Sequence, residues 1–344
     1  MSAASVVLPA EWAPQSAVQL TWPRPEGDFA RHFDAVEHTF VALATAITRF
    51  QDLLIACGPD VAGLRARLIA AGAQAQRLHL YPVPANDVWA RDHGPITIFR
   101  DGQPRHLDFI FNGWGGKFDA SLDDQVTQQL AAQHAWRAPV ESLPFVLEGG
   151  GIESDGLGTL LTTERCLLAS TRNPQFDKAQ IEAKLKGWFG LTRVLWLRHG
   201  DLIGDDTDGH IDTIARFCDA TTIAYQACDD HTDPHYDDLK AMEAELQGLR
   251  TAEGHPYTLV PLPLPAAILD EEGKRLPAGY PNFLILNGAV LVPTYGDTAN
   301  DAVALERLRP CFPQREVIGV DCRALIQQYG SLHCVTMQIP RASA

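Results

Sequence analysis

The segment ITIFRDGQPRHLDFIF, residues 96–111, contains two strand-like runs joined by a turn. Residues 96–99 and 106–111 are rich in branched and aromatic side chains, which favour extended backbone. Between them lies Asp101-Gly102, a pair that tolerates the positive φ angles of a tight hairpin turn. The segment therefore predicts an antiparallel hairpin.

The same pattern recurs three more times along the chain. Residues 151–153 and 159–162 flank Asp155-Gly156, residues 210–217 and 221–225 flank Asp219-Ala220, and residues 283–286 and 289–294 flank Asn287-Gly288. Polar stretches with helical spacing follow the four hairpins at 121–135, 175–188, 234–249 and 299–309, and short apolar runs follow the helices at 145–147, 194–197, 257–262 and 316–320. Each hairpin therefore opens a predicted strand–strand–helix–strand unit.

A first unit precedes these four and contains predicted strands at 17–22, 52–57 and 78–83, with helices near 31–49 and 61–72. The last apolar run, residues 332–339, has no helix after it and is predicted to pair with the first strand. Five units of about 50–70 residues are typical of a repeated, propeller-like α/β array. On pattern alone, the alternative is an ordinary α/β domain with unremarkable hairpins.

Composition narrows the class of protein. The 344 residues are 46% hydrophobic and 21% charged, as in a globular protein with a large core. A formal net charge of -15 disfavours nucleic acid and anionic membrane surfaces as partners and suits a small cation. There is no apolar run of membrane-spanning length and no secretory signal pattern, so a cytoplasmic location is expected.

The seven cysteines are scattered, odd in number and without a C-x-x-C pair, which disfavours a zinc site or a disulfide framework. Residues 204–212, GDDTDGHID, are different because they contain four carboxylates and one histidine. Such a cluster could hold a divalent metal, or an organic cation beside an acid–base group. The spacing does not fit a calcium loop, and one histidine is a weak basis for a hydrolytic metal. On a strand, His210 and Asp212 would point to the same side.

Four reactive residues share one phase of the repeat. Asp92 precedes the second unit's hairpin, Glu148 precedes the third, His210 opens the fourth, and Cys334 lies near the start of the closing strand. Their separations are 56 (148 − 92), 62 (210 − 148) and 124 (334 − 210), the last being two periods. In a ring of units these side chains would converge on the central axis.

Several long motifs, in order, carry a family resemblance. They are PAEWAPQSAVQLTWP (9–23), DVWARDHGP (87–95), FNGWGGKF (111–118), EGGGIESDGLGTLLTTERCLL (148–168), TRNP (171–174), GDDTDGHID (204–212) and LHCVTMQIP (332–340). With these motifs the chain resembles the agmatine deiminase family, a branch of the Porphyromonas-type peptidylarginine deiminases. The family usually has G-G-G-N-[IL]-H-C at the last motif, where this chain has Gly330-Ser331-Leu332-His333-Cys334.

The resemblance implies a five-bladed α/β propeller (the pentein fold) of pseudo-fivefold symmetry, with residues 1–344 forming one catalytic domain of five repeat units. It also implies a hydrolase acting on linear amidines without a metal or another cofactor, in putrescine biosynthesis. The reaction would convert agmatine to N-carbamoylputrescine and ammonia through a covalent amidino-cysteine. By motif match, Cys334, His210 and Glu148 are the catalytic residues, and Asp92 and Asp212 bind the substrate. A homodimer is expected at the family level.

These residue types suit a guanidinium, because its N–H donors form a planar fork that matches carboxylates. Nearby acids should raise the pKa of the Cys334 thiol and a bound cation should lower it, so substrate would help to generate its own nucleophile. Trp89 and Trp114 are candidates to line the aliphatic chain or to stack on the cation, unless they are simply core residues.

The far amine of agmatine would prefer an acid, and Glu153, Asp206 and Asp208 are the candidates for it. Free arginine would need a basic partner for its carboxylate, and only Arg91 and Lys117 lie near the motifs. The sequence therefore favours agmatine. A peptidylarginine deiminase is the alternative enzyme. A metal-dependent hydrolase and a non-catalytic polyamine-binding protein are the alternatives of other classes.

Overall fold

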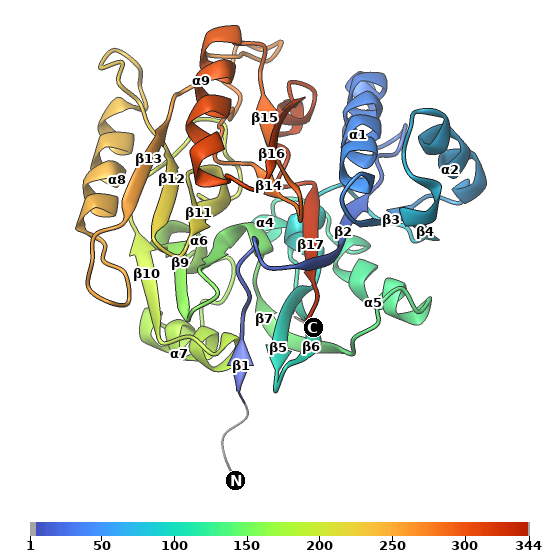
Figure 1. The fold of residues 1–344 in the computed structure, drawn as a ribbon, viewed down its shortest axis with the longest axis horizontal. Coiled ribbons are helices and arrows are strands. Elements are labelled where there is room, and N and C mark those ends of the chain that lie inside the picture. Colours follow the sequence, from blue (N-terminus) through green and yellow to red (C-terminus); the bar gives the residue numbers. More distant parts are fainter. Residues whose placement is uncertain (1–4, 343–344) are drawn as a thin grey trace.

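The computed structural model describes residues 5–342 and has a mixed α/β architecture built on five small sheets (Figure 1). The strand orders are β1-β5-β6-β7, β10-β9-β8, β11-β12-β13, β14-β15-β16 and β17-β2-β3-β4. In Figure 1 the longer helices lie toward the outside of the molecule, and the strands occupy its interior. No single large sheet forms among the described residues.

The hairpin at residues 96–111 is confirmed. Strands β5 (Ile96–Arg100) and β6 (Gln103–Ile110) pair antiparallel, with Arg100 opposite Gln103. Asp101 and Gly102 have φ angles of 51° and 75°, as the tight turn requires. The other three hairpins also form, as β8 (Ile152–Ser154) with β9 (Thr159–Thr163), β11 (Ala215–Asp219) with β12 (Thr222–Gln226), and β14 (Leu284–Ile285) with β15 (Ala289–Thr294).

The second strand of each hairpin then pairs parallel with the strand that follows in the unit, because a connecting segment carries the chain back across the sheet. These parallel partners are β7 (Val140–Val146), β10 (Arg193–Leu197), β13 (Thr258–Leu262) and β16 (Glu316–Asp321). The helices before them are α5 (Val126–Ala132), α7 (Lys178–Phe189), α8 (Tyr236–Gly248) and α9 (Thr298–Leu308). The predicted strand–strand–helix–strand order is thus present in all four units.

The opening unit consists of β2 (Gln15–Thr21), α1 (Phe33–Thr48), β3 (Asp52–Cys57), α2 (Val61–Ala70) and β4 (Leu78–Pro82). The last strand, β17 (Thr336–Pro340), pairs antiparallel with β2, so the predicted closure of the chain ends is confirmed. The short strand β1 (Val6–Val7) pairs with β5 and was not predicted. Two residues of strand are too few to give a sequence pattern.

Two strands begin later than predicted, and both differences affect reactive residues. Strand β11 begins at Ala215, whereas His210 precedes a 3-10 helix, Ile211–Thr213. Asp208 and Gly209 have φ angles of 68° and 82°, which break extended backbone just before His210. Likewise β17 begins at Thr336, and Cys334 lies in the turn before it. Both residues therefore sit in short connecting segments, where irregular backbone can aim a side chain.

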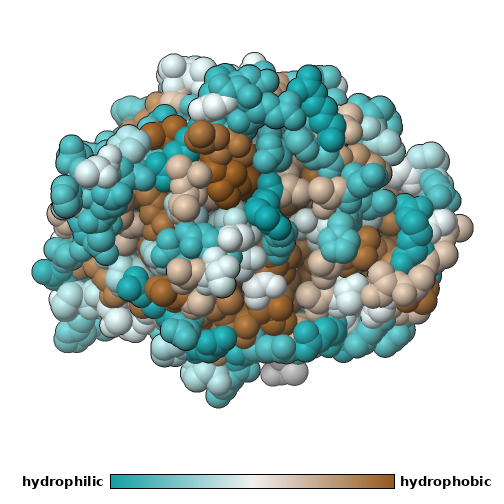
Figure 2. Space-filling view, turned by 90° about the horizontal axis from the view of Figure 1, so that it is seen from above, coloured by the Kyte–Doolittle hydropathy of each residue, from teal (hydrophilic) through white to brown (hydrophobic). Residues whose placement is uncertain are grey.

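Burial is concentrated between the sheets and their helices. A large hydrophobic cluster joins the opening and last units, and smaller clusters fill the others. The face in Figure 2 is mainly hydrophilic, with hydrophobic residues in small areas. Within residues 5–342, no helix combines the length and apolar character needed to cross a bilayer.

Candidate active site

The five residues singled out by phase and motif are all buried and all lie in short segments next to strands. Asp92 belongs to the single-turn helix α3 (Ala90–His93), and Glu148 lies between β7 and a 3-10 turn. Asp212 follows His210 in the 3-10 helix before β11, and Cys334 precedes β17. Their exposed fractions are 3% for Asp92, 0% for Glu148, His210 and Asp212, and 4% for Cys334.

Three of these residues meet around Gly150. A Cβ atom placed there would lie 2.5 Å from His210 Nδ1, 2.8 Å from Asp92 Oδ1 and 3.2 Å from Asp212 Oδ2. The backbone N–H of Gly150 donates to Asp92 Oδ1 at 3.0 Å, and His210 Nδ1 lies 3.6 Å from the same oxygen. Any side chain at Gly150 would therefore displace the acid or the histidine.

The thiol faces a pocket of about 380 Å³ that is open to solvent at its mouth. Cys334, Asp92, Trp89 and Trp114 line it, together with Asp206 and the 328–330 loop. The two predicted tryptophans thus line the pocket as well as joining the hydrophobic core.

Asn282 is a site residue that the sequence did not reveal. Its Oδ1 accepts from the Cys334 thiol at 3.4 Å, and its Nδ2 donates to the Asp212 carbonyl at 3.2 Å. It precedes β14 and divides the 124-residue gap into 72 (282 − 210) and 52 (334 − 282). The 124-residue gap, two repeat periods long, was therefore the signal from which a site residue near Asn282 could have been predicted.

Arg172, from the TRNP motif, was also missed. Its Nε donates to both oxygens of Glu148, at 2.9 and 3.0 Å, and the two side chains are fully buried. Its other nitrogens donate to Asp208 Oδ2 and to the Thr207 carbonyl, both at 2.7 Å. Arg172 therefore ties Glu148 to the GDDTDGHID loop and pairs with this buried carboxylate.

Asp208 was a candidate to bind the distal amine of the substrate, but it does not line the pocket. Its second oxygen accepts from Lys117 Nζ at 2.7 Å, so both oxygens are engaged by cations. Glu153, another candidate for the distal amine, forms an ion pair with the buried Arg216 and lines a different cavity. Asp206 is the member of this set that faces the pocket.

The two tryptophans also fix the acids beside them. Trp114, at φ 54° within α4 (Gly113–Gly116), donates its Nε1–H to Asp92 Oδ2 at 3.0 Å. Trp89 donates to Asp87 Oδ2 at 2.7 Å. A Cβ at Gly330 would lie 2.1 Å from the Trp89 ring, so the loop before Cys334 can pass this ring only with glycine there.

Two clusters have the spacing of metal ligands, but a guanidinium already neutralises each one. Glu148, Cys166 and His210 offer atoms within 4.8 Å of one another, and Arg172 holds Glu148. Glu11, Glu153 and His333 form the second cluster, and Arg216 pairs with both of its acids. Within the described chain, the acids of GDDTDGHID do not form such a set with His210. The charge of that loop is divided among separate partners.

Burial and neighbouring charges shift the pKa values of the ionisable groups in the site. Burial, and then Glu148, raise the pKa of Asp92 to about 7. Burial and Asp92 raise the pKa of Asp212 well above its usual range. Burial, followed by Asp212 and Asp92, raises the pKa of the Cys334 thiol, while burial and Arg172 lower that of His210. These shifts favour the protonated form of Asp212, the neutral thiol of Cys334 and the neutral imidazole of His210.

Comparison with known proteins agrees with this geometry. The family model described as Porphyromonas-type peptidyl-arginine deiminase matches residues 7–340. The chain belongs to this family. Among curated proteins, agmatine deiminase of Stutzerimonas stutzeri (strain A1501) is 35% identical over 357 residues, covering 97% of this chain and 95% of the relative.

Solved structures show that the similarity extends to the fold. A Porphyromonas gingivalis protein described as a candidate arginine deiminase is 51% identical, with a TM-score of 0.92, covering 98% of this chain and 99% of that one. A cysteine-to-serine variant of C. jejuni agmatine deiminase, solved with substrate bound, is 34% identical, with a TM-score of 0.91, covering 99% and 98%.

Proposed function

We propose that this protein is an agmatine deiminase, which hydrolyses the guanidinium of agmatine to N-carbamoylputrescine and ammonia. The observation that carries the proposal is a buried thiol beside two buried acids that lack a cation. Asp212 Oδ1 and both ring nitrogens of His210 have no hydrogen-bond partner among the described residues. Buried polar atoms are normally satisfied, so a ligand that donates N–H groups would complete this site. The relatives named agmatine deiminase support that choice of ligand.

We further propose that the five sheets are the blades of an α/β propeller with pseudo-fivefold symmetry, and that residues 1–344 are one catalytic domain. The repeated strand order and the pairing of β17 with β2 support this arrangement. The reactive residues and Asn282 each precede or open a blade. A homodimer and a cytoplasmic location remain predictions.

In the proposed complex, Asp92 and Asp212 bind two edges of the guanidinium as carboxylates. A planar guanidinium donates N–H groups to carboxylates in matched pairs, and the pairing is strong in a site that excludes water. The central carbon would then face Cys334. Trp89 and Trp114 line the aliphatic chain, and Trp114 also keeps Asp92 in place through its indole N–H.

The proposed chemistry begins when the Cys334 S–H proton passes to His210 and the thiolate forms a C–S bond with the guanidinium carbon. His210 returns the proton to a departing nitrogen, the C–N bond breaks, and ammonia leaves an amidino-cysteine. Water then forms a C–O bond as His210 removes its proton. The C–S bond then breaks and His210 returns its proton to sulfur, which restores the thiol. The hydroxyl proton of the adduct leaves to solvent, where it converts ammonia to ammonium, so the carbamoyl product is neutral.

Glu148 is proposed to act on His210 and on the substrate cation through its charge. Both of its oxygens accept from Arg172, so the carboxyl group is fixed in position. Asp206 is proposed to receive the distal ammonium, because it lines the pocket. Burial, and then Asp205, raise the pKa of its carboxyl to about 7. A second cation at that place would favour the ionised acid.

The proposed function is tested by ammonia release from four substrates. We expect agmatine to have the highest kcat/KM, because it satisfies both ends of the pocket. Butylguanidine, which lacks only the distal ammonium, should be about tenfold or more poorer, equivalent to about 1.4 kcal/mol. Free arginine and a blocked peptidylarginine should be poorer still, because each adds bulk or a carboxylate at an acidic mouth.

A higher kcat/KM for the blocked peptidylarginine would support the peptidylarginine deiminase alternative instead. Activity that is lost with a chelator but spared by iodoacetamide would indicate the metal-dependent hydrolase. Absence of ammonia from all four substrates would leave the non-catalytic polyamine-binding protein.

A change at Trp114 is expected to move the pH profile. Because the indole N–H favours ionised Asp92, Trp114→Phe should raise the pKa of this acid above about 7. Guanidinium binding requires the carboxylate, so kcat/KM falls as pH drops through that pKa. The acidic limb should therefore shift to higher pH in the variant, with a loss at pH 7 of about tenfold for a lost hydrogen bond to a charge.

The matched control for this profile is Trp136→Phe, whose Nε1–H donates to the Thr127 carbonyl away from the site. It should leave the acidic limb in place. An unchanged limb in Trp114→Phe would contradict the assignment of Asp92.

A further inference from the structure

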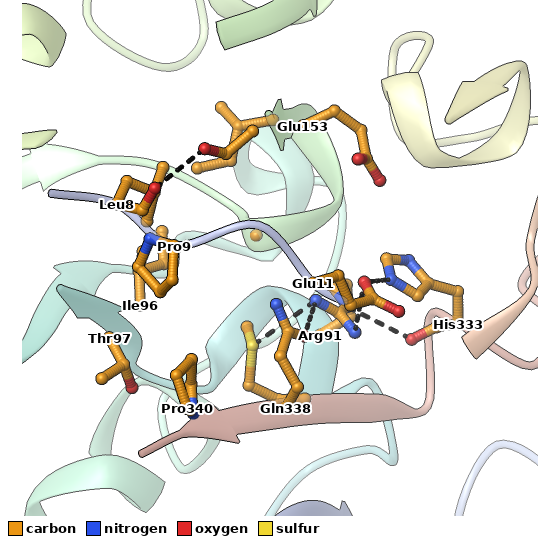
Figure 3. A pocket seen from close by; sticks show the side chains of 14 residues that line it. Leu8, Pro9, Glu11, Arg91, Ile96, Thr97, Glu153, His333, Gln338 and Pro340 are labelled. Atoms are coloured by element: carbon orange, nitrogen blue, oxygen red, sulfur yellow. Dashed lines mark hydrogen bonds and ion pairs between the residues drawn. The ribbon is translucent and has the colours of Figure 1, made fainter. Parts of the chain in front are cut away.

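A chain of short hydrogen bonds leads from the active site to a second cavity. Asp212 Oδ2 lies 2.7 Å from His333 Nδ1, and Glu11 Oε2 lies 2.7 Å from His333 Nε2. The cavity behind them, about 500 Å³ with its open mouth, is lined by Glu11, His333 and Arg91 (Figure 3). The proposed mechanism does not use His333, although this residue touches a substrate-binding acid.

The number of hydrogens in these contacts restricts the protonation states of Asp212, His333 and Glu11. Each 2.7 Å contact needs one hydrogen, so Asp212, His333 and Glu11 share two hydrogens between two contacts. In one arrangement Asp212 is protonated and donates to neutral His333, which donates to ionised Glu11. In a second, both acids are carboxylates and His333 is an imidazolium. In a third, Glu11 is protonated and donates to neutral His333, which donates to the Asp212 carboxylate. The first two arrangements differ by one proton moving from Asp212 Oδ2 to His333 Nδ1.

The surrounding charges favour the first arrangement in the empty site. Burial would raise the pKa of Glu11, but Arg216 and His333 outweigh it and hold this pKa well below its usual range. Burial and Arg216 lower the pKa of His333, whereas burial and Asp92 raise that of Asp212. The proton therefore rests on Asp212 while no cation is present.

The charged and titratable groups that face this chain lie on several elements. Asp92, Arg91, Asp205 and Glu11 act on Asp212, together with the adjacent His210 and Cys334, and Arg216, Arg91, Glu11 and Glu153 face His333. Arg216 donates to Glu11 at 2.7 Å, and Arg91 Nη2 lies 3.8 Å from the same oxygen. Glu11 is therefore a fixed anion that can stabilise a charged His333.

We propose that His333 takes the proton from Asp212 when a guanidinium binds, and returns it when the neutral product forms. The Oδ2–H bond of Asp212 breaks and an Nδ1–H bond of His333 forms, so no proton crosses to solvent. Asp212 and His333 are 0% and 1% exposed, which leaves the imidazole as the proton acceptor in contact with this oxygen. His333 is thus a positioning residue, which acts on the substrate only through Asp212.

This inference rests on the proposed role of Asp212 as a guanidinium ligand. It adds a reason for product release, since the carbamoyl product carries no charge at the former guanidinium. Without that charge the proton returns to Asp212. The protonated acid then binds the product less strongly than the carboxylate bound the guanidinium. An uncharged side chain at position 333 could keep one hydrogen bond but could not accept the proton.

The test counts protons released when agmatine binds to a chain that cannot react. Cys334→Ala is titrated with agmatine by calorimetry at pH 7.5 in phosphate and in Tris, whose ionisation enthalpies differ. The same measurement is made with His333→Asn or His333→Gln added. Asn can keep the contact to Asp212 and Gln the contact to Glu11, so either variant that folds is sufficient.

Both double variants are expected to release about one proton more per agmatine bound than Cys334→Ala alone. Any proton that Asp92 releases when agmatine binds is released in Cys334→Ala and in the double variants alike, so it cancels in this difference. Below the pKa of Asp212, log Kd for agmatine should also depend more steeply on pH in these variants. For each unit rise in pH it should fall by about one unit more than in Cys334→Ala with His333 intact. The control is His106→Asn in the same background, a buried histidine that bonds Thr97 and faces no carboxylate, which should leave the proton count unchanged.

Equal proton release with and without His333 would overturn the inference, even though agmatine still binds. Failure of agmatine to bind Cys334→Ala at all would count against the proposed function itself. The two failures are therefore distinguishable in one set of titrations.

Discussion

Replacing Cys334 by alanine is expected to reduce kcat for ammonia release from agmatine by a factor on the order of 10⁴ to 10⁶, the loss seen when a covalent nucleophile is removed. The folded chain should persist, because the thiol is a small buried group and alanine fits its place. Agmatine should still bind, since the carboxylates of Asp92 and Asp212 remain. The measurement is ammonia release by the variant, with binding followed separately by calorimetry.

The size of this effect follows from the state of the thiol. Burial, Asp212 and Asp92 all raise the pKa of Cys334, so the free enzyme holds it as an inert thiol. A bound guanidinium offsets those two acids and allows ionisation beside the carbon that is attacked. No second thiol lines the pocket and none could replace it among the described residues.

Cys228→Ala is the matched control, because Cys228 is also buried but bonds only to the Asp230 carbonyl at the edge of another unit. Its activity should stay within about twofold of the parent. Activity of Cys334→Ala within tenfold of the parent would contradict the covalent mechanism.

The repeat units were predictable because each one carries its own local signals. Asp101-Gly102 and Asn287-Gly288 mark turns whatever surrounds them, and the branched residues on both sides favour strands. The pairing of β17 with β2 could be predicted too, since an apolar run without a following helix needs a partner. Periodicity did not predict the backbone of residues 208–214, where two positive φ angles and a 3-10 helix precede the strand, which begins at Ala215.

The site was predictable only where a residue had its own motif or phase. Asp92, Glu148, His210 and Cys334 stood out because acids, histidine and cysteine are chemically conspicuous at those positions. Asn282 occupies the same phase but is a common turn residue, so only the gap in the series pointed to it. Arg172 and Glu11 reach the site through long-range ion pairs that the local sequence does not encode.

These ion pairs explain why so many charges can be buried together. Arg172 neutralises Glu148, and Arg216 neutralises Glu11 and Glu153, since an unpaired buried charge is costly. Asp92 and Asp212, beside the thiol, have no Arg or Lys partner among the described residues, and burial raises their pKa values. The acids that the substrate is proposed to pair are thus among those that the protein leaves without a cationic side chain.

Asp212→Asn is for this reason expected to reduce kcat/KM for agmatine by a factor of about 10² to 10⁴, equivalent to the 2–5 kcal/mol lost when a buried charge pair is broken. The amide is nearly the same size as the acid, so the packing is kept. It cannot become an anion, so it gives the guanidinium no charged partner at this edge. Steady-state kinetics and calorimetric Kd values in the Cys334→Ala background measure the loss.

Most of this loss should appear in binding as well as in catalysis, because the cation is present before the thiol attacks and disappears only with the neutral product. Asp201→Asn is the control for net charge. Asp201 is an exposed acid in the segment before the GDDTDGHID loop and pairs with Arg165 at the surface. That variant removes the same charge but should change kcat/KM by less than twofold, because solvent screens exposed pairs. A loss below tenfold in Asp212→Asn would mean that Asp212 does not bind the guanidinium, and that the buried acid has another partner.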